Sequence, residues 1–349
     1  MADVTRLLRD LTSADAATFG GKSAALGELI AAEIPVPPGF GISTSAYRAF
    51  VESAGLDGLI ATTMARVDPD DVDTVGTASH AIGEAMRSAP VPGAVLDEVA
   101  ARYEELGGPP VAVRSSALGE DSKEATFAGQ QETYLWVRGA DAVCDAVRDC
   151  WVSLYSPPAI TYRSRLGEKM EPAMGVAVQV MVDAEVSGVM FTCNPVSGDP
   201  SMVAINASWG LGLAVVGGEV TPDDCLVSKV TREIVREHVH DKAVEYVPDA
   251  DGRGAVRVEV PEERRRRPCL DRTLVEALVD VGRRVERYFG SAQDIEWATA
   301  RGAELPSSLF VLQTRPVTTQ PKPAEKSKPA SALSLLMSTF GAGERPRDS

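Results

Sequence analysis

Apolar and polar positions alternate with helical periodicity through the first part of this chain. After a glycine pair, residues 19–35 show the apolar spacing of an amphipathic helix, and a mostly helical stretch then continues to about residue 107. PVPPGF at 35–40 ends the first helix, because proline has no amide hydrogen to donate, and the acidic segment VDPDDVD at 67–73 predicts a turn. This part of the chain is therefore predicted to be largely helical.

From residue 111 onward, short β-rich runs dominate. VAVRSSA predicts a buried strand, and ATFAGQQETYLWV predicts a glycine-containing loop that leads into another strand. Further strands are expected over 174–182, 187–195 and 202–210, and helices over about 140–166 and 274–290. The runs AQDIEWA and LFVLQTRPV predict a hairpin joined by TARGAELPSS. Helices and strands are thus mixed along the chain, which indicates an α+β protein of two or three lobes.

Composition narrows the function classes. The chain has 349 residues and a formal net charge of −15, which argues against general binding to nucleic acids or membrane surfaces, because both are polyanions. The N-terminus predicts no signal peptide, and no apolar run is long enough to span a bilayer. Five cysteines without a CxxC pair predict reduced thiols and a cytoplasmic protein rather than a zinc site or a disulfide framework.

The segment ATFGGKS at 17–23 invites comparison with a phosphate-binding loop. The Walker pattern requires a glycine five positions before Gly21, where this chain has Ala16, so an ordinary P-loop is excluded. Two interpretations remain. The segment is either a helix N-terminus with a surface lysine, or a site at which free amides and the Lys22 ammonium meet an anion.

The last predicted hairpin brings together oxygen ligands and a cation. Asp294 and Glu296 are two residues apart on one strand and share a face, and Gln313 and Arg315 do the same on the next strand. This arrangement suits Mg²⁺ bound to polyphosphate, with Arg315 neutralising charge. The alternative is a solvated polar face. In both cases Ile295 and Trp297 are expected in the core.

Other polar groups lie in the first half of the β-rich region. Arg114 ends a buried strand and is either an ion-pair partner or a phosphate clamp, with the hydroxyls of Ser115 and Ser116 beside it. The FAGQQET loop offers Gly129, where backbone amides approach a phosphate, and Thr133. Gln179 and the following residues 180–182 could form a hinge whose peptide groups bind adenine.

Eight ordered motifs resemble one family. They are GGKSAALGEL, VPPGF, VAVRSSALGEDS, ATFAGQQETYLWV, SGVMFTCNP, GLG with VTPDD, DIEWA and LQTRP. Over about residues 10–320 they resemble the N-terminal ATP-binding domain of phosphoenolpyruvate synthase, which also occurs in pyruvate phosphate dikinase and rifampicin phosphotransferase. The resemblance implies an ATP-grasp-like fold over 1–320, with lobes of roughly 1–185 and 186–320 that hold the nucleotide, followed by a flexible tail at 321–349.

The resemblance also implies roles for individual residues. Lys22, Arg114 and Arg315 match catalytic phosphate-binding cations. Matches to ATP-binding residues are Gly129, Thr133 and Gln179. Glu296 and Gln313 match metal-linked ATP ligands, and Asp294 matches their acidic neighbour. One departure is Leu213, which stands where the family often has glutamate after GLG.

A second departure concerns the phosphate acceptor. Members of the family pass phosphate from ATP to a histidine in a glycine–threonine–histidine motif, and none of His80, His238 and His240 has that context. The chain therefore resembles the ATP-binding subunit of phenylphosphate synthase. It is expected to use ATP and Mg²⁺ to phosphorylate a histidine on a separate subunit, which passes the phosphate to an acceptor such as a phenol or pyruvate and releases AMP and phosphate.

Two alternatives stay open: a non-catalytic nucleotide-binding regulatory subunit, and a self-sufficient small-molecule phosphotransferase of the antibiotic type. The LSLLM patch of the tail is expected to be available to a partner.

Overall fold

The structure is a computed structural model that describes residues 3–117, 133–166, 172–249 and 254–317. Gly129 and the tail expected at 321–349 therefore lie outside the described residues. The chain forms two compact units. The first contains residues 1–27, 38–181 and 252–254, and the second contains 28–37, 182–251 and 255–349. The second unit thus includes a short segment, 28–37, that interrupts the first unit in the sequence.

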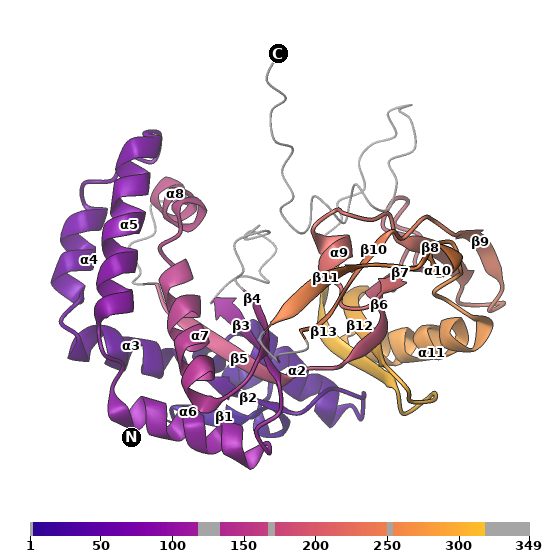
Figure 1. The fold of residues 1–349 in the computed structure, drawn as a ribbon, viewed down its shortest axis with the longest axis horizontal. Helices are drawn as coiled ribbons and strands as arrows, with labels where there is room; N and C mark the ends of the chain where they lie inside the picture. The colour runs from indigo at the N-terminus through magenta and orange to yellow at the C-terminus, as the bar shows by residue number, and fades with distance from the viewer. Residues whose placement is uncertain (1–2, 118–132, 167–171, 250–253, 318–349) are drawn as a thin grey trace. The chain divides into compact units, whose positions relative to one another are not determined.

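The first unit is built on a five-stranded antiparallel sheet. Its strand order is β1-β2-β5-β3-β4 (Figure 1). The strands are β1 (Thr5–Leu7), β2 (Gly39–Ile42), β3 (Val111–Ala117), β4 (Thr133–Val137) and β5 (Met174–Val180). The strand predicted over VAVRSSA is present as β3, and the strand predicted to follow the glycine loop is present as β4.

Helices supply most of the rest of the first unit. They are η1 (Leu8–Asp10), η2 (Ser13–Asp15), α1 (Ala16–Phe19), α2 (Gly21–Ala31), α3 (Thr44–Ser53), α4 (Asp57–Met64), α5 (Val72–Ser88), α6 (Gly93–Glu105), α7 (Ala140–Ser153) and α8 (Pro157–Leu166), with the end of α2 belonging to the second unit. The largely helical character predicted for the region before residue 107 is confirmed.

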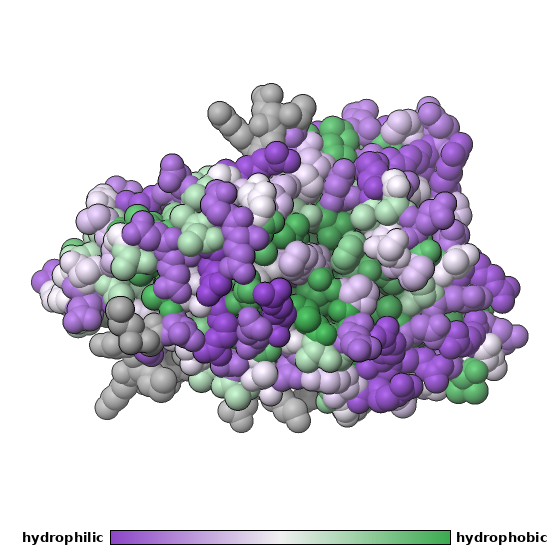
Figure 2. Space-filling model, turned by 90° about the horizontal axis from the view of Figure 1, so that it is seen from below, coloured by the Kyte–Doolittle hydropathy of each residue, from purple (hydrophilic) through white to green (hydrophobic). Residues whose placement is uncertain are grey.

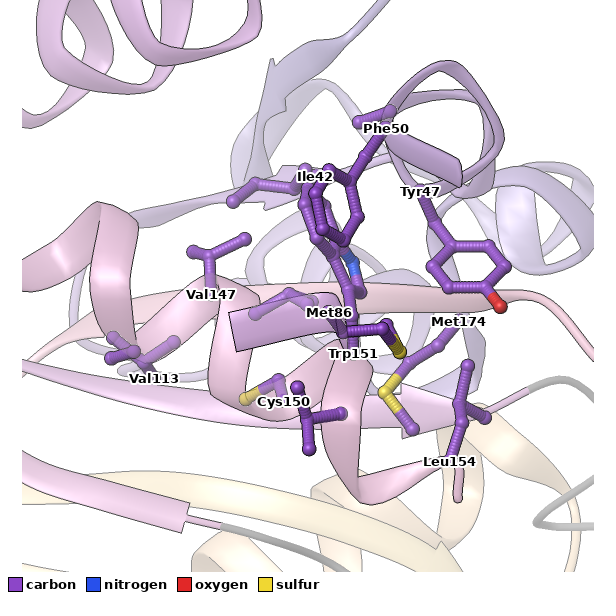
Figure 3. Packing of buried hydrophobic residues seen from close by; sticks show 14 of the residues in the cluster. Ile42, Tyr47, Phe50, Met86, Val113, Val147, Cys150, Trp151, Leu154 and Met174 are labelled. Atoms are coloured by element: carbon purple, nitrogen blue, oxygen red, sulfur yellow. The ribbon is translucent and has the colours of Figure 1, made fainter. Parts of the chain in front are cut away.

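One face of this sheet packs against the helices around Trp151. Its indole ring stacks on Phe50 at a centroid distance of 5.5 Å and meets the edge of Tyr47 at 6.2 Å (Figure 3). Val113 of β3 belongs to the same buried cluster. The Tyr47 hydroxyl, which is buried in this core, lies 2.8 Å from the hydroxyl of Tyr155. Burial raises the pKa of Tyr47 well above its ordinary value, so this hydroxyl stays neutral.

The opposite face of the sheet carries small side chains. Gly39 and Gly41 of β2 lie beside Gln179 and Ala177 of β5 in the strand register. Gly175 lies so close to α1 that an added Cβ would come within 2.3 Å of the carbonyl oxygen of Phe19. This lack of side-chain volume allows α1 and α2 to approach the sheet backbone closely.

The second unit is built on a six-stranded antiparallel sheet of order β13-β12-β6-β7-β8-β9, beside a two-stranded sheet of β10 and β11. The strands are β6 (Ala184–Phe191), β7 (Met202–Trp209), β8 (Asp223–Ser228), β9 (Ile234–His238), β10 (Val244–Pro248), β11 (Ala255–Glu259), β12 (Gln293–Ala300) and β13 (Leu309–Pro316). The helices are α9 (Leu213–Val216), α10 (Glu262–Arg265) and α11 (Arg272–Phe289).

Helix α11 covers one face of the large sheet. Its N-cap Asp271 accepts a hydrogen bond from the amide of Leu274, and it ends at Gly290, which adopts a left-handed conformation with φ of 70°. The predicted helix end at Gly290 is thereby confirmed. Gly282 lets the helix approach β6, because an added Cβ would lie 3.1 Å from the sulfur of Met190. Figure 2 shows that hydrophilic residues predominate on the visible surface of the second unit around α11.

All five cysteines are free thiols, and burial raises the pKa of Cys225 to about 12. Among the described helices, none combines the length and the hydrophobicity that crossing a lipid bilayer requires.

Candidate functional site

Lys22 lies in the first turn of helix α2, directly after a sharp corner at Gly20. Gly20 has φ of 85°, and an added Cβ would come within 2.2 Å of the Ser116 hydroxyl oxygen, so only glycine suits this position. The close approach holds Lys22 over β3: its backbone amide donates to Ser116 Oγ at 3.0 Å and its Nζ donates to the carbonyl oxygen of Ser115 at 2.5 Å. Lys22 is only 5% exposed.

One sequence-based interpretation of this segment, a helix N-terminus with a surface lysine, is therefore wrong, whereas anion binding at Lys22 stays a prediction. Lys22 is not a surface lysine, because its side chain is buried. Nor are its backbone amide and its ammonium group free, since both donate hydrogen bonds within the unit. An ammonium group has three N–H donors, so binding to β3 is compatible with an additional anionic ligand.

Arg114, Thr133 and Gln179 share the small-residue face of the five-stranded sheet. Arg114 is the Cα partner of Thr133 on β4 and of Ala177 on β5. Gln179 lies two residues beyond Ala177 on β5, so its side chain points to the same face. Ser116 is on this face as well, and it binds the amide of Lys22. The first unit thus gathers four predicted ligand residues, Lys22, Arg114, Thr133 and Gln179, over one side of its sheet.

The side chain of Gln179 is a stronger candidate for ligand binding than the backbone that follows it. The amide of Val180 donates to the carbonyl oxygen of Pro38 at 2.8 Å, and the amide of Met181 donates to that of Pro110 at 2.9 Å. These two N–H groups are therefore used within the protein, and adenine binding by the remaining peptide groups of 180–182 stays a prediction. Gln179 itself is 2% exposed, and its Nε2 has no hydrogen-bond partner among the described residues. A buried donor without a partner is costly, which favours a ligand acceptor at this position.

In the second unit, the predicted hairpin is present and its polar residues face one another in pairs. Asp294 of β12 lies opposite Arg315 of β13, and Glu296 lies opposite Gln313. Ile295 and Trp297 point to the other face and are buried, as predicted. Arg315 Nε donates to Asp294 Oδ2 at 2.9 Å. Burial raises the pKa of Asp294 to about 6, and the attraction of Arg315 opposes part of that rise.

A β-bulge in β13 makes this pairing possible. Glu296 pairs with Gln313 whereas Trp297 pairs with Val311, so Leu312 is the extra residue. Without the bulge, strict alternation would place Val311 and Gln313 on the same face. With it, Val311 enters the core and Gln313 joins the polar face.

The polar face of β12 and β13 suits a hard cation. Gln313 is 7% exposed, and its Oε1 has no hydrogen-bond partner in the described part of the chain. The amide oxygen lies opposite the Glu296 carboxylate, and oxygen atoms of both kinds bind Mg²⁺. No group of three His, Cys, Asp or Glu side chains within the described ranges is arranged to hold a metal ion. A cation here would therefore depend on amide oxygens in addition to carboxylates.

Sequence reasoning missed one residue of this face. Asn206 of β7 is 3% exposed, and its Oδ1 has no hydrogen-bond partner among the described residues. It lies within MVAINASWG, a segment for which the sequence predicted only a strand. An asparagine in an otherwise apolar central strand is the signal that could have identified it.

His238 lies on the same face of the six-stranded sheet as Asn206, because it is the Cα partner of Asp224, which is in turn the Cα partner of Asn206. His80 is exposed on α5. His238 and His240 lie at the end of the edge strand β9, where a ring nitrogen of each approaches Asp224 Oδ2, at 3.0 and 3.4 Å. His238 is the last residue of β9, and His240 lies two residues beyond the strand. Leu213 is half-buried at the start of α9.

Comparison with known proteins shows a close family likeness. Residues 16–334 match the family described as pyruvate phosphate dikinase, AMP/ATP-binding domain. A probable phosphoenolpyruvate synthase of Methanocaldococcus jannaschii is 38% identical over 328 residues, which cover 92% of this chain and 27% of that protein. The phosphoenolpyruvate synthase of Pyrococcus furiosus is 36% identical over 380 residues, which cover 95% of this chain and 46% of that protein. The chain thus spans less than half the length of these two relatives.

Proposed function

The chain belongs to the pyruvate phosphate dikinase AMP/ATP-binding domain family, as its ordered motifs predicted, and from this premise we propose that it binds ATP with Mg²⁺ and activates it for phosphoryl transfer. In this proposal Lys22 and Arg114 bind phosphate oxygens, with Gly129 and Thr133 as neighbouring contacts. Gln179 binds the base, and Arg315 neutralises the charge that develops on the transferred group. An ATP-grasp-like arrangement of the nucleotide forms part of the same proposal.

The strongest support for this proposed function is the pairing of Asp294 with Arg315 and of Glu296 with Gln313 across two strands. A guanidinium oriented by a buried carboxylate lies next to an oxygen pair suited to a divalent cation. Both are needed to neutralise a polyphosphate in a protein whose net charge is −15. A hairpin that served only stability would gain little from a buried amide oxygen without a partner.

We further propose that the phosphate acceptor is a histidine outside the described residues, carried by a partner subunit. Its ring nitrogen attacks the β-phosphorus, and the bond from that phosphorus to the oxygen of the α-phosphate breaks, so that AMP leaves. The γ-phosphate then passes to water and is released as phosphate. From the phosphohistidine, the phosphoryl group goes to an acceptor such as pyruvate or a phenol. Support comes from the positions of the three histidines: His80 is an exposed residue of α5, His238 ends the edge strand β9, and His240 follows that strand.

The test uses ATP labelled at the β-phosphate. The chain alone should bind Mg²⁺-ATP in calorimetry without releasing AMP, and a histidine-bearing partner should acquire acid-labile label when it is added. Absence of ATP binding by the folded chain would contradict the nucleotide site. Label on His80, His238 or His240 of the lone chain, or steady AMP release without a partner, would contradict the need for an external histidine.

A further inference from the structure

A single row of residues crosses the polar face of the six-stranded sheet. Gln313 pairs with Glu296, Glu296 with Val189 of β6, and Val189 with Asn206 of β7. Residues directly opposite one another in antiparallel strands share a face, so these four side chains project to the same side. Glu296 therefore has an amide residue on each side of it: Gln313 one strand away and Asn206 two strands away.

The two amides have the same unusual property. Both are buried, and the Oε1 of Gln313 and the Oδ1 of Asn206 each lack a hydrogen-bond partner in the described part of the chain. A buried acceptor left without a donor costs about 1–3 kcal/mol, so two in one row call for a physical explanation. A bound group that both oxygens contact would supply it.

The neighbouring polar residue does not satisfy Asn206. Asp224 of β8 is its Cα partner, but that carboxylate is engaged with other groups at the sheet edge. Its contacts are Arg236 Nη2 at 3.3 Å, His238 Nδ1 at 3.0 Å and His240 Nε2 at 3.4 Å. A carboxylate offers acceptor oxygens and no donor, so Asp224 leaves the Asn206 Oδ1 without a partner.

The geometry of the sheet allows Glu296 and Asn206 to act on one ion. Two strand spacings separate them by roughly 10 Å at the backbone. Val189 between them is shorter than glutamate, so the Glu296 carboxylate can extend over it toward the Asn206 amide. Because the described residues contain no group of three His, Cys, Asp or Glu side chains suited to a metal, a cation at Glu296 needs neutral oxygens to complete its coordination shell.

We propose that Asn206 is a ligand of the divalent cation in this site and contributes its Oδ1 from the side opposite Gln313. The proposal rests on the proposed Mg²⁺-ATP function and extends the ligand set beyond the Glu296–Gln313 pair. Hard cations accept carboxylate and amide oxygens together, and the Asn206 oxygen loses its desolvation penalty when the ion binds.

The experiment measures Mn²⁺ binding by electron paramagnetic resonance, with Mn²⁺ alone and with Mn²⁺ plus ATP. Asn206→Leu should weaken Mn²⁺ binding at least tenfold in both arms and leave metal-free ATP affinity unchanged. Asn206→Asp should tighten binding of Mn²⁺ alone, because it adds a negative charge to the ligand set. Ser208→Ala is the matched control: Ser208 Oγ is also buried without a partner on β7, but its row contains Ser187 and Ala298 rather than Glu296. It should bind Mn²⁺ as the wild type does.

Wild-type Mn²⁺ affinity in Asn206→Leu would overturn the inference, since a purely structural asparagine can be replaced by leucine without effect on the ion. Equal loss of ATP affinity with and without metal would also overturn it, because Asn206 would then contact the nucleotide directly. If the wild-type chain binds no ATP, the proposed function fails, and the Mn²⁺-only arm still decides the role of Asn206.

Discussion

Asp294 and Arg315 form an ion pair across β12 and β13, with 2.9 Å between Asp294 Oδ2 and Arg315 Nε. The Asp294 side chain is 6% exposed and the Arg315 side chain is 21% exposed, with Arg315 Nη2 buried. The pair therefore fixes the direction of Arg315 while leaving it able to meet a phosphate oxygen.

The stability of the protein should depend on the protonation of Asp294. Burial raises its pKa from 3.8 to about 6, so the folded state binds this proton more tightly than the unfolded state. The resulting stabilisation is fully present below pH 3.8 and is lost as the pH rises through 6. It amounts to about 3 kcal/mol at most, from the shift in pKa. Asp294→Asn cannot titrate and should lack this component. Urea denaturation of both proteins between pH 4 and 7 tests it, and identical pH slopes would contradict the shift.

Loss of a phosphate-binding cation should weaken ATP binding. Lys22→Met, Arg114→Ala and Arg315→Ala should each cost about 1–3 kcal/mol of binding free energy, because each removes a charge-assisted hydrogen bond. Arg283→Ala on α11 is the control, since this helix covers the opposite face of the sheet. Calorimetry on folded variants is the measurement. Unchanged affinity in all three variants would exclude the proposed phosphate contacts.

Substitution of the oxygen ligands should weaken ATP binding only when metal is present. Glu296→Gln and Gln313→Leu should reduce Mg²⁺-ATP affinity and turnover with a partner, yet leave ATP affinity in EDTA unchanged, because their effect passes through the ion. ATP titrations with and without Mg²⁺ distinguish an effect that passes through the ion from a direct effect on ATP binding. Equal losses in both would mean that these residues contact ATP directly or stabilise the fold.

A buried ion pair joins the segment between β9 and β10 to the start of β8. Lys242 is fully buried, and its Nζ donates to Asp223 Oδ1 at 2.5 Å, while Asp223 Oδ2 accepts from the amide of Cys269 at 2.8 Å. Asp223→Ala leaves an ammonium group buried without its counter-charge and should lower the free energy of unfolding by about 3–5 kcal/mol. Chemical denaturation measures this change. Arg232→Ala, which breaks an exposed pair with Asp280, should change the stability far less. A similar effect of both variants would contradict the interpretation.

The sequence predicted the features that depend on local pattern. Helix α11 has strong 3.6-residue periodicity and a glycine stop, and β12 and β13 have period-two alternation, so their positions and the shared face of Asp294 and Glu296 could be inferred. The contacts of Lys22 could not. They depend on Ser116, which is 94 residues away in the chain and comes into contact only through the small-residue face of the sheet. The position of Asn206 beside this site could not be inferred for the same reason, since its row forms only after four strands have paired.

The bulge at Leu312 shifts by one residue the alternation of side chains between the two faces of β13. Deleting Leu312 removes the extra residue, so Val311 and Gln313 become neighbours, alternate strictly and keep their partners Trp297 and Glu296 on β12. A regular ladder that kept Leu312 would instead put Val311 and Gln313 on one face, so that either Val311 would leave the core or Gln313 and Arg315 would turn toward the face covered by α11. An insertion within 301–308, outside the paired residues, carries no such conflict. Tolerance to changes in length should therefore differ between two neighbouring segments, and a family alignment of β13 should contain gaps before residue 309 but, between 311 and 315, only a gap that removes Leu312.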